Sequence, residues 1–299
     1  MHVRVKTIWA AALGAAVAVL AAQALSSAPA AAATLPFGTV RAFEKQSPFD
    51  AQPVKSFSTA CPAGERVLGG GAFTVGGVHA VITEMQPIHP ATGVDTFKVT
   101  AAADQFGIAG TWSFQVFAFC AVVPAGAQLE IKPHTNLPTS FGTDQASTQC
   151  SPGKLLIGTG GKIDNGGGQV DLGMFPNSNG QLATGSAAFA KEDADGFAGQ
   201  YTVTGYSVCA KPNLLDDFRM VRASFRAAAG VPSQKTVASC PSGMALTGLA
   251  GATVLPGTHL QQIRSNTANT AANLATFGAQ SSVTPAEAWD MDTAVFCAR

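Results

Sequence analysis

The feature that most constrains this chain is a motif that occurs three times. Each copy begins with a cysteine, passes through a turn and enters a glycine-rich apolar run: CPAGERVLGGG from Cys61, CSPGKLLIGTGG from Cys150 and CPSGMALTGLAG from Cys240. The copies are 89 and 90 residues apart. A fixed period of this length indicates that one supersecondary unit is repeated along the chain.

Two further features recur with the same period. An aromatic residue stands eight positions before a second cysteine in WSFQVFAFC, YTVTGYSVC and WDMDTAVFC, which end at Cys120, Cys209 and Cys297. The stretches TVRAFEK, QLEIKPH and FRMVRAS, each beginning 22 residues before a first cysteine, have the composition of short strands. Three repeats of about 89 residues therefore follow one another, over 35–123, 124–212 and 213–299.

The glycines of the motif are predicted to be structural. A phosphate-binding loop would end in Gly-Lys-Ser/Thr, and no copy does. The glycines three residues after each first cysteine are predicted to adopt a positive φ in a turn: Gly64, Gly153 and Gly243. The glycines eight residues after it indicate a β-bulge or a close approach of two backbones: Gly69, Gly158 and Gly248.

The periodicity between these features predicts an all-β fold. In the first repeat the strands are predicted at VKSFSTA, RVLGGGAFTV, HAVITEMQ, TFKVTAAA and WSFQVFAF. No stretch after the first 33 residues combines a helical period with helix caps. Two architectures satisfy this pattern: a β-prism-like body with pseudo-threefold symmetry, or three small β-sandwiches in a row.

The last strand of the first repeat indicates which side chains form the core. Trp112, Phe114 and Val116 alternate with Ser113 and Gln115, so the two polar residues are expected to face water. The two aromatic residues that follow break the alternation, which predicts that the end of the strand is covered on both faces: Phe117 and Phe119.

Six cysteines in an exported chain predict three disulfides, for which the sequence alone allows fifteen pairings. Each repeat contains one early and one late cysteine, and the expected bridges lie within the repeats: Cys61–Cys120, Cys150–Cys209 and Cys240–Cys297. A zinc site is not expected, because the chain has no Cys-x-x-Cys and no clustered Cys/His spacing.

The first 33 residues have the three parts of a signal peptide, with Arg4 and Lys6 before an apolar run and small residues before Thr34. We expect cleavage before Thr34 and a secreted, extracellular protein; a membrane anchor is the competing interpretation. No second membrane-length apolar span follows. The remainder has 16 basic and 18 acidic residues, a net charge of −2 that predicts no nucleic-acid partner.

The pattern CPxGxxxxGxG, with a later aromatic residue and a closing cysteine, resembles that of uncharacterised secreted repeat proteins of actinobacteria. The resemblance spans all three repeats and implies no activity. The chain is more faintly similar to vitelline membrane outer layer protein I, which is a threefold β-prism with Cys and Gly after a turn. The repeats of that family are shorter, and no functional residue is implied by it.

Two groupings could suggest catalysis. Ser151 and Lys154 match the Ser-x-x-Lys of penicillin-recognising enzymes, but they precede a β-run and lack the partner motifs. Asp290 and Asp292 share one strand face, as the acid and base of a glycosidase might, yet ordinary polar residues take their places in the other repeats. No catalytic residue is therefore predicted.

Two other groupings could suggest a metal site. His79 and Glu84 are predicted to point to opposite faces of a strand, and His89 has no equivalent in the other repeats. The segment from Lys191 to Gly196 resembles a calcium loop but lacks the remaining ligands, so it is predicted to be a hairpin turn. We expect neither a metal nor another cofactor.

The sequence favours a non-catalytic, lectin-like protein that binds polysaccharide or cell wall. The alternatives are a secreted hydrolase acting on polysaccharide or cell wall, and a structural or protective protein without a small ligand. Recognition is expected in segments that the repeats do not share: Met85 to Gly93, Met174 to Leu182 and His259 to Asn273. The candidate ligand-binding residues are Phe175, Asn177, Asn179, Gln262 and Asn266.

Overall fold

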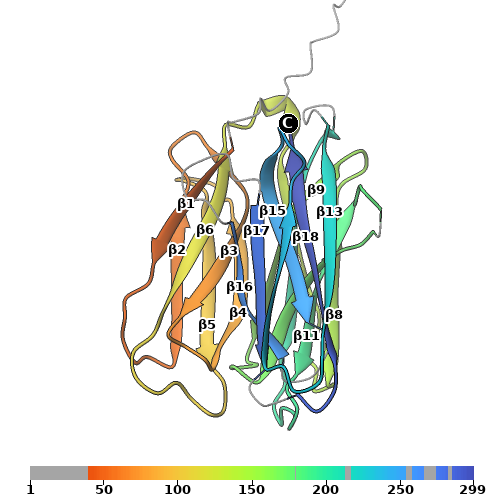
Figure 1. Ribbon diagram of the computed structural model, residues 1–299. Helices are drawn as coiled ribbons and strands as arrows, with labels where there is room; N and C mark the ends of the chain where they lie inside the picture. Colours follow the sequence, from red (N-terminus) through yellow and green to blue (C-terminus); the bar gives the residue numbers. More distant parts are fainter. Residues whose placement is uncertain (1–39, 179, 213–216, 254–257, 266–273, 282–284) are drawn as a thin grey trace, which may run out of the picture. The chain divides into compact units, whose positions relative to one another are not determined.

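The computed structural model describes residues 40–178, 180–212, 217–253, 258–265, 274–281 and 285–299. Over these ranges the chain forms 18 β-strands and a single 3₁₀ turn at Ala125–Ala127, with no α-helix (Figure 1). The predicted all-β class is therefore confirmed. The predicted signal peptide lies outside the described residues, and among those described no helix is long and apolar enough to cross a membrane.

The first repeat contains six strands, which include all five predicted stretches: β1 (Arg41–Gln46), β2 (Val54–Ala60), β3 (Arg66–Val75), β4 (Ala80–Ile88), β5 (Thr96–Ala103) and β6 (Ser113–Ala121). They pair in two antiparallel groups of three. Strand β6 lies between β1 and β3, and strand β5 lies between β2 and β4.

The second repeat contains β7 (Glu130–Thr135), β8 (Thr143–Gln149), β9 (Leu155–Asp164), β10 (Val170–Pro176), β11 (Gly185–Glu192) and β12 (Thr202–Ala210). The third contains β13 (Arg219–Ala227), β14 (Ser233–Ser239), β15 (Ala245–Thr253), β16 (Thr258–Ser265), β17 (Leu274–Ser281) and β18 (Trp289–Ala298). The pairing of the first repeat recurs in both: the sixth strand joins the first and third, and the fifth joins the second and fourth.

Strands from different repeats also pair with one another. Strand β3 pairs with β16, and strand β4 pairs with β9, which creates two six-stranded sheets, β1-β6-β3-β16-β17-β14 and β2-β5-β4-β9-β12-β7. The other strands form two three-stranded sheets, β10-β11-β8 and β13-β18-β15. All described residues belong to one compact unit, Ala33–Arg299. Neither expected architecture describes these four sheets, because both six-stranded sheets contain strands from two repeats.

Three glycines from different repeats meet where the third strands approach one another. A Cβ atom on Gly69 would lie 2.9 Å from the Cα of Gly248, and one on Gly248 would lie 2.5 Å from the Cα of Gly158. The strand register also shifts next to Gly69 and Gly248. The predicted bulge and close backbone approach are both confirmed, and only glycine fits this junction.

The turn and the disulfide of each repeat follow the prediction. The three turn glycines have positive φ: Gly64 at 84°, Gly153 at 78° and Gly243 at 82°. The bridges are Cys61–Cys120, Cys150–Cys209 and Cys240–Cys297, with no free cysteine among the described residues. Each bridge fixes the segment between the second and third strands to the sixth strand of the same repeat.

Strand β6 confirms most of the predicted core and corrects one residue. The alternating apolar side chains are fully buried, and so are the residues beyond them, so both faces are covered there: Trp112, Phe114, Val116, Phe117 and Phe119. Ser113 was expected to face water but is buried. Its hydroxyl accepts a hydrogen bond from Gln46 of the neighbouring strand β1 (Nε2–Oγ 2.9 Å), which replaces the lost hydration.

Candidate functional site

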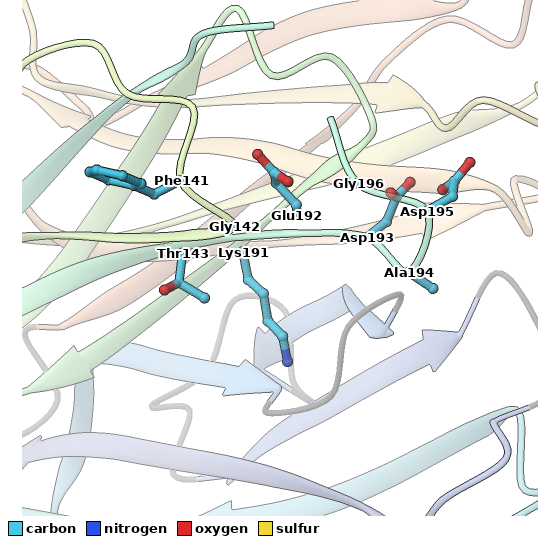
Figure 2. Close-up of a pocket in the computed structure, with 9 residues that line it drawn as sticks. All are labelled: Phe141, Gly142, Thr143, Lys191, Glu192, Asp193, Ala194, Asp195 and Gly196. Atoms are coloured by element: carbon cyan, nitrogen blue, oxygen red, sulfur yellow. The ribbon is translucent and has the colours of Figure 1, made fainter. Parts of the chain in front are cut away.

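A pocket of about 490 Å³ lies where the end of β11 meets the start of β8 (Figure 2). The register places Lys191 opposite Thr143, and the chain continues from each into a loop. The lining residues come from these two segments: Phe141, Gly142, Thr143, Lys191, Glu192, Asp193, Ala194, Asp195 and Gly196.

Three carboxyl groups gather on one side of this pocket. Figure 2 shows Glu192, Asp193 and Asp195 on one side of the backbone, and Lys191 and Thr143 on the other. Asp193 is only 8% exposed, and neither of its carboxylate oxygens makes a hydrogen bond of regular geometry, although Asp195, Gln105 and the backbone N–H of Gly196 lie near enough to shift its pKa. The Oε1 atom of Glu192 is likewise buried without a partner. The pocket therefore offers acceptor positions that the protein does not use.

The other carboxylate oxygens of the cluster are held by defined donors. Asp195 Oδ1 accepts a hydrogen bond from Gln105 Nε2 (2.9 Å), which connects the acidic loop to the loop after β5. Glu192 Oε2 accepts one from the backbone N–H of Phe197 (3.2 Å). These contacts fix the position of the loop.

The electrostatics of the pocket follow from crowding several charges in a partly buried place. Burial and the neighbouring carboxyl group of Asp195 raise the pKa of Asp193 to about 6. Burial lowers the pKa of Lys191 to about 8, against the attraction of Asp171 on the paired strand. Burial, with the charge of Asp193, raises the pKa of Asp171 well above its usual range. Asp193 therefore ionises close to neutral pH.

An aromatic ring stands beside the carboxylates. The side chain of Phe141 is 75% exposed, and its backbone is held by buried Tyr201, whose hydroxyl donates to the Phe141 carbonyl (2.5 Å). Thr139, two residues earlier, exchanges backbone hydrogen bonds with Tyr201 (2.9 Å each). The ring is thus presented to solvent from an anchored loop.

A second exposed ring lies on the neighbouring loop. Phe106 directly follows Gln105, the residue bound to Asp195, and is 57% exposed. Its ring centroid lies 5.5 Å from that of His79, whose Nδ1 is 2.8 Å from Asp104 Oδ2. Exposed rings next to carboxylates suit a ligand with both hydroxyl groups and apolar faces, because rings cover C–H surfaces while carboxylates accept from hydroxyls.

The structure places the candidate ligand-binding residues apart from this pocket. Phe175 is half-buried within β10, next to Met174, which is buried. Asn177 is exposed, and its Nδ2 donates to the Thr148 carbonyl (3.4 Å). Gln262 lies within β16 rather than in a connecting segment, and is buried. Two further candidates lie outside the described residues: Asn179 and Asn266.

The groupings that resembled metal sites have other roles. His79 contacts Asp104 and His89 contacts Asp95 (Nδ1–Oδ1 2.5 Å), while Glu84 binds Lys98. Within the described parts of the chain, no group of three or more His, Cys, Asp or Glu side chains could hold a metal ion.

The groupings that resembled catalytic residues are also explained by local contacts. Ser151 Oγ (2.9 Å) and Lys154 Nζ (2.7 Å) both donate to Glu130 Oε2. Asp290 pairs across the strands with Arg226 (3.0 Å), and Asp292 binds a serine hydroxyl of β13. Both aspartates therefore belong to polar cross-strand pairs.

Sequence reasoning found one half of the acidic pocket and missed the other. The segment Lys191–Gly196 was noted for its carboxylates, but as a hairpin turn. Phe141 was missed, because a single aromatic residue in a loop carries no periodicity. The available signal was that TSFGT, around Phe141, has no counterpart in the other repeats.

No known protein family matches the sequence, and no curated protein matches it. The function must therefore be argued from the chain's own residues.

Proposed function

We propose that this chain is an extracellular, non-catalytic protein that binds polysaccharide or cell wall in a lectin-like manner. One observation carries the proposal: the exposed ring of Phe141 lines the same pocket as the carboxylates of Glu192 and Asp193, three of whose oxygens make no hydrogen bond of regular geometry. A sugar has what both lack, since its hydroxyls donate hydrogen bonds and its C–H face packs on an aromatic ring. The open pocket suits part of a long chain rather than an enclosed small molecule.

Secretion is part of the proposal. The three disulfides are compatible with an oxidising compartment, where such bridges form and persist. The signal-peptide pattern of the first 33 residues points the same way. N-terminal sequencing of the protein from the culture medium is expected to begin within a few residues of Thr34. Recovery of the intact N-terminus in the membrane fraction would instead support an anchored protein.

We also propose that 35–123, 124–212 and 213–299 are three copies of one structural unit related by a pseudo-threefold axis. The recurring strand pairing and the meeting of Gly69, Gly158 and Gly248 support this proposal. On this basis, shared residues serve folding, and binding is assigned to residues that only one copy has. Phe141 and Glu192 meet that criterion, whereas Asp193 has a counterpart in Asp104 of the first repeat.

Retention on immobilised polysaccharides and purified cell walls tests the binding function. The variants Phe141→Ala and Asp193→Asn are expected to weaken retention about tenfold each, the effect of losing one good contact. Leu137→Ala is the matched control, because Leu137 is an exposed apolar residue (86%) outside the pocket. Equal retention of all three variants would exclude this pocket, and no retention of the wild type would favour a structural or protective role.

A secreted hydrolase is the second candidate, favoured by the ionisation of the aspartates. A carboxyl group with a pKa of about 6, such as Asp193, can donate a proton near neutral pH. A hydrolase would release new reducing ends from the retained polysaccharide, and Asp193→Asn would abolish the release. Binding without any release of reducing ends is the outcome that we expect.

A further inference from the structure

A second pocket, of about 210 Å³, lies over the six-stranded sheet that contains β16. Four of its residues follow a row across four strands: Phe73 of β3 is opposite Gln262, Gln262 is opposite Gly278 of β17, and Gly278 is opposite Lys235 of β14. Three neighbours of this row are buried in the core: Ala72, Ile263 and Phe277. Because side chains alternate along a strand, the row lies on the outer face of the sheet.

Gln262 is the unusual member of this row. Its side chain is 2% exposed, and neither the amide nitrogen nor the amide oxygen has a hydrogen-bond partner. A buried amide without partners destabilises a fold, so such groups are rare unless a ligand uses them. This one lines a pocket, which a ligand can enter.

The space for the pocket exists because residue 278 is glycine. A Cβ atom at Gly278 would lie 2.5 Å from both Cγ and Nε2 of Gln262, so any larger residue would displace the amide. Glycine is otherwise unfavourable inside a strand, because it adds flexibility and buries no side chain. The absence of a side chain at Gly278 therefore leaves room for the Gln262 side chain in its observed position.

The equivalent place in the other six-stranded sheet has no such unsatisfied group. There Glu84 stands opposite Lys162 and Thr100, as Gln262 stands opposite Phe73 and Gly278. Glu84 accepts a hydrogen bond from the Thr100 hydroxyl and pairs with Lys98 (2.9 Å). The same backbone arrangement thus allows a buried polar side chain, Glu84, to be hydrogen-bonded. Of the two sheets, only the one that contains Gln262 has an amide without a partner at this place.

The charge around the pocket indicates the ligand. Lys235 lines it and is exposed, and no acidic residue lines it. The guanidinium carbon of Arg264 lies 4.2 Å from the centroid of the Phe73 ring, and its Nε is buried without a partner. Lys235 and the amide N–H of Gln262 favour a ligand that carries a carboxylate, and Arg264, which does not itself line the pocket, adds positive charge beside Phe73.

We infer that this pocket binds one acidic sugar residue, a hexuronate, within a polysaccharide. The inference rests on the proposed polysaccharide-binding function and adds the chemical class of the ligand. A sugar hydroxyl donates to the Gln262 oxygen, the Gln262 N–H donates to the sugar, and the carboxylate faces Lys235. The apolar face of the ring packs on Phe73. The volume lies below the 300–1,000 Å³ or so of drug-sized pockets, which fits a single sugar residue.

Calorimetric titration with a galacturonate trisaccharide, and with the neutral galactose trisaccharide as reference, tests the inference. The wild-type protein is expected to bind the galacturonate about tenfold or more tightly than the neutral sugar, and to lose affinity in high salt. Gln262→Leu and Gly278→Ser are each expected to weaken galacturonate binding about tenfold, because one removes the amide and the other displaces it.

Two further variants distinguish a wrong inference from a strand variant that does not fold. Lys235→Ala changes an exposed side chain, so it keeps the test valid if a strand variant does not fold; it is expected to remove most of the preference for galacturonate. Leu137→Ala, at an exposed residue outside both pockets, is expected to leave galacturonate binding unchanged. If galacturonate binds equally to all variants, or does not bind to the wild type while cell-wall retention still depends on Phe141, the inference is wrong and the proposed function stands.

Discussion

Glu84 and Gln262 stand at corresponding places in the two six-stranded sheets, where a strand of one repeat meets a strand of another. The register shifts by one residue next to each of them, after Ile82 and after Leu260, so the backbone is alike at both. Glu84 is surrounded by donors, whereas Gln262 faces a glycine and a pocket. One backbone arrangement therefore serves as a closed polar contact in one sheet and as an open site in the other.

A third junction shows that polar groups are not needed for the fold. Where β10 approaches β15, Gly173 lies beside Ala252: a Cβ atom on the glycine would be 2.5 Å from the Cβ of the alanine. Its opposite neighbour on β11 is Phe189. An apolar junction thus suffices between these two repeats, so the amide of Gln262 is not explained by the needs of the backbone.

The largest predicted effect on stability comes from removing the Thr100 hydroxyl that donates a hydrogen bond to Glu84. Thr100 stands opposite Glu84, as Gly278 stands opposite Gln262, so Thr100→Gly places a glycine opposite Glu84 as well. The variant loses a donor to a buried carboxylate and gains the flexibility of glycine, so we expect the free energy of unfolding to fall by about 2–4 kcal/mol. Chemical denaturation measures the change. A loss of less than about 0.5 kcal/mol would mean that the Thr100 contact does not distinguish the two junctions.

The second predicted effect is an increase in stability. Gln262→Leu removes a buried amide that has no partner and replaces it with an apolar side chain of similar size. We therefore expect the free energy of unfolding, without ligand, to rise by about 1–2 kcal/mol. Such a gain would indicate that the wild-type residue is kept for binding at the expense of stability. Destabilisation by the same substitution would show that the amide has a structural partner.

The smallest predicted effect concerns the acidic pocket, which differs from both junctions in carrying ionisable groups near neutral pH. The folded-state pKa of Asp193, about 6, lies above the ordinary aspartate value of 3.8, so the folded protein holds this proton more tightly than the unfolded chain. Stability from this group is full below about pH 4 and is lost as the pH rises through 6. Asp193→Asn should therefore raise the melting temperature by a few degrees at pH 7.5.

The control for this prediction is the same pair of proteins at pH 4. There Asp193 is protonated in the folded state, so it is already neutral like asparagine and the two melting temperatures should agree. Thermal melts at both pH values measure the difference. An equal difference at the two pH values would assign the effect of the substitution to packing instead of ionisation.

Much of the fold could be predicted from the sequence because it repeats. Each repeat has one early and one late cysteine, 59, 59 and 57 residues apart, and this recurrence reduced fifteen possible disulfide pairings to the observed set. Alternation predicted the strands themselves, and a glycine in a strand, as at Gly69, predicted a close backbone approach. The pairing of β3 with β16 and of β4 with β9 was not predictable, because a strand pattern does not specify its neighbour at a sheet edge.

The candidate sites were less accessible to sequence reasoning. Gln262 was selected because its segment is not shared by the repeats, but it was expected in an exposed connection and not in a strand. Its significance depends on Gly278, sixteen positions away, which only strand register brings beside it. Phe141 and Asp193 are likewise distant in the sequence and meet through the pairing of β8 with β11.

Hydrogen exchange with and without a bound polysaccharide tests the proposed function most directly. At saturating concentrations of a polysaccharide that retains the protein, we predict slower amide exchange at 139–143 and 191–197, around Phe141 and Asp193. Exchange near the turn glycines that all repeats share, such as Gly64, should not change. Protection confined to the shared turns, or none at 139–143 and 191–197 although the polysaccharide is bound, would contradict the proposal that this pocket is the binding site.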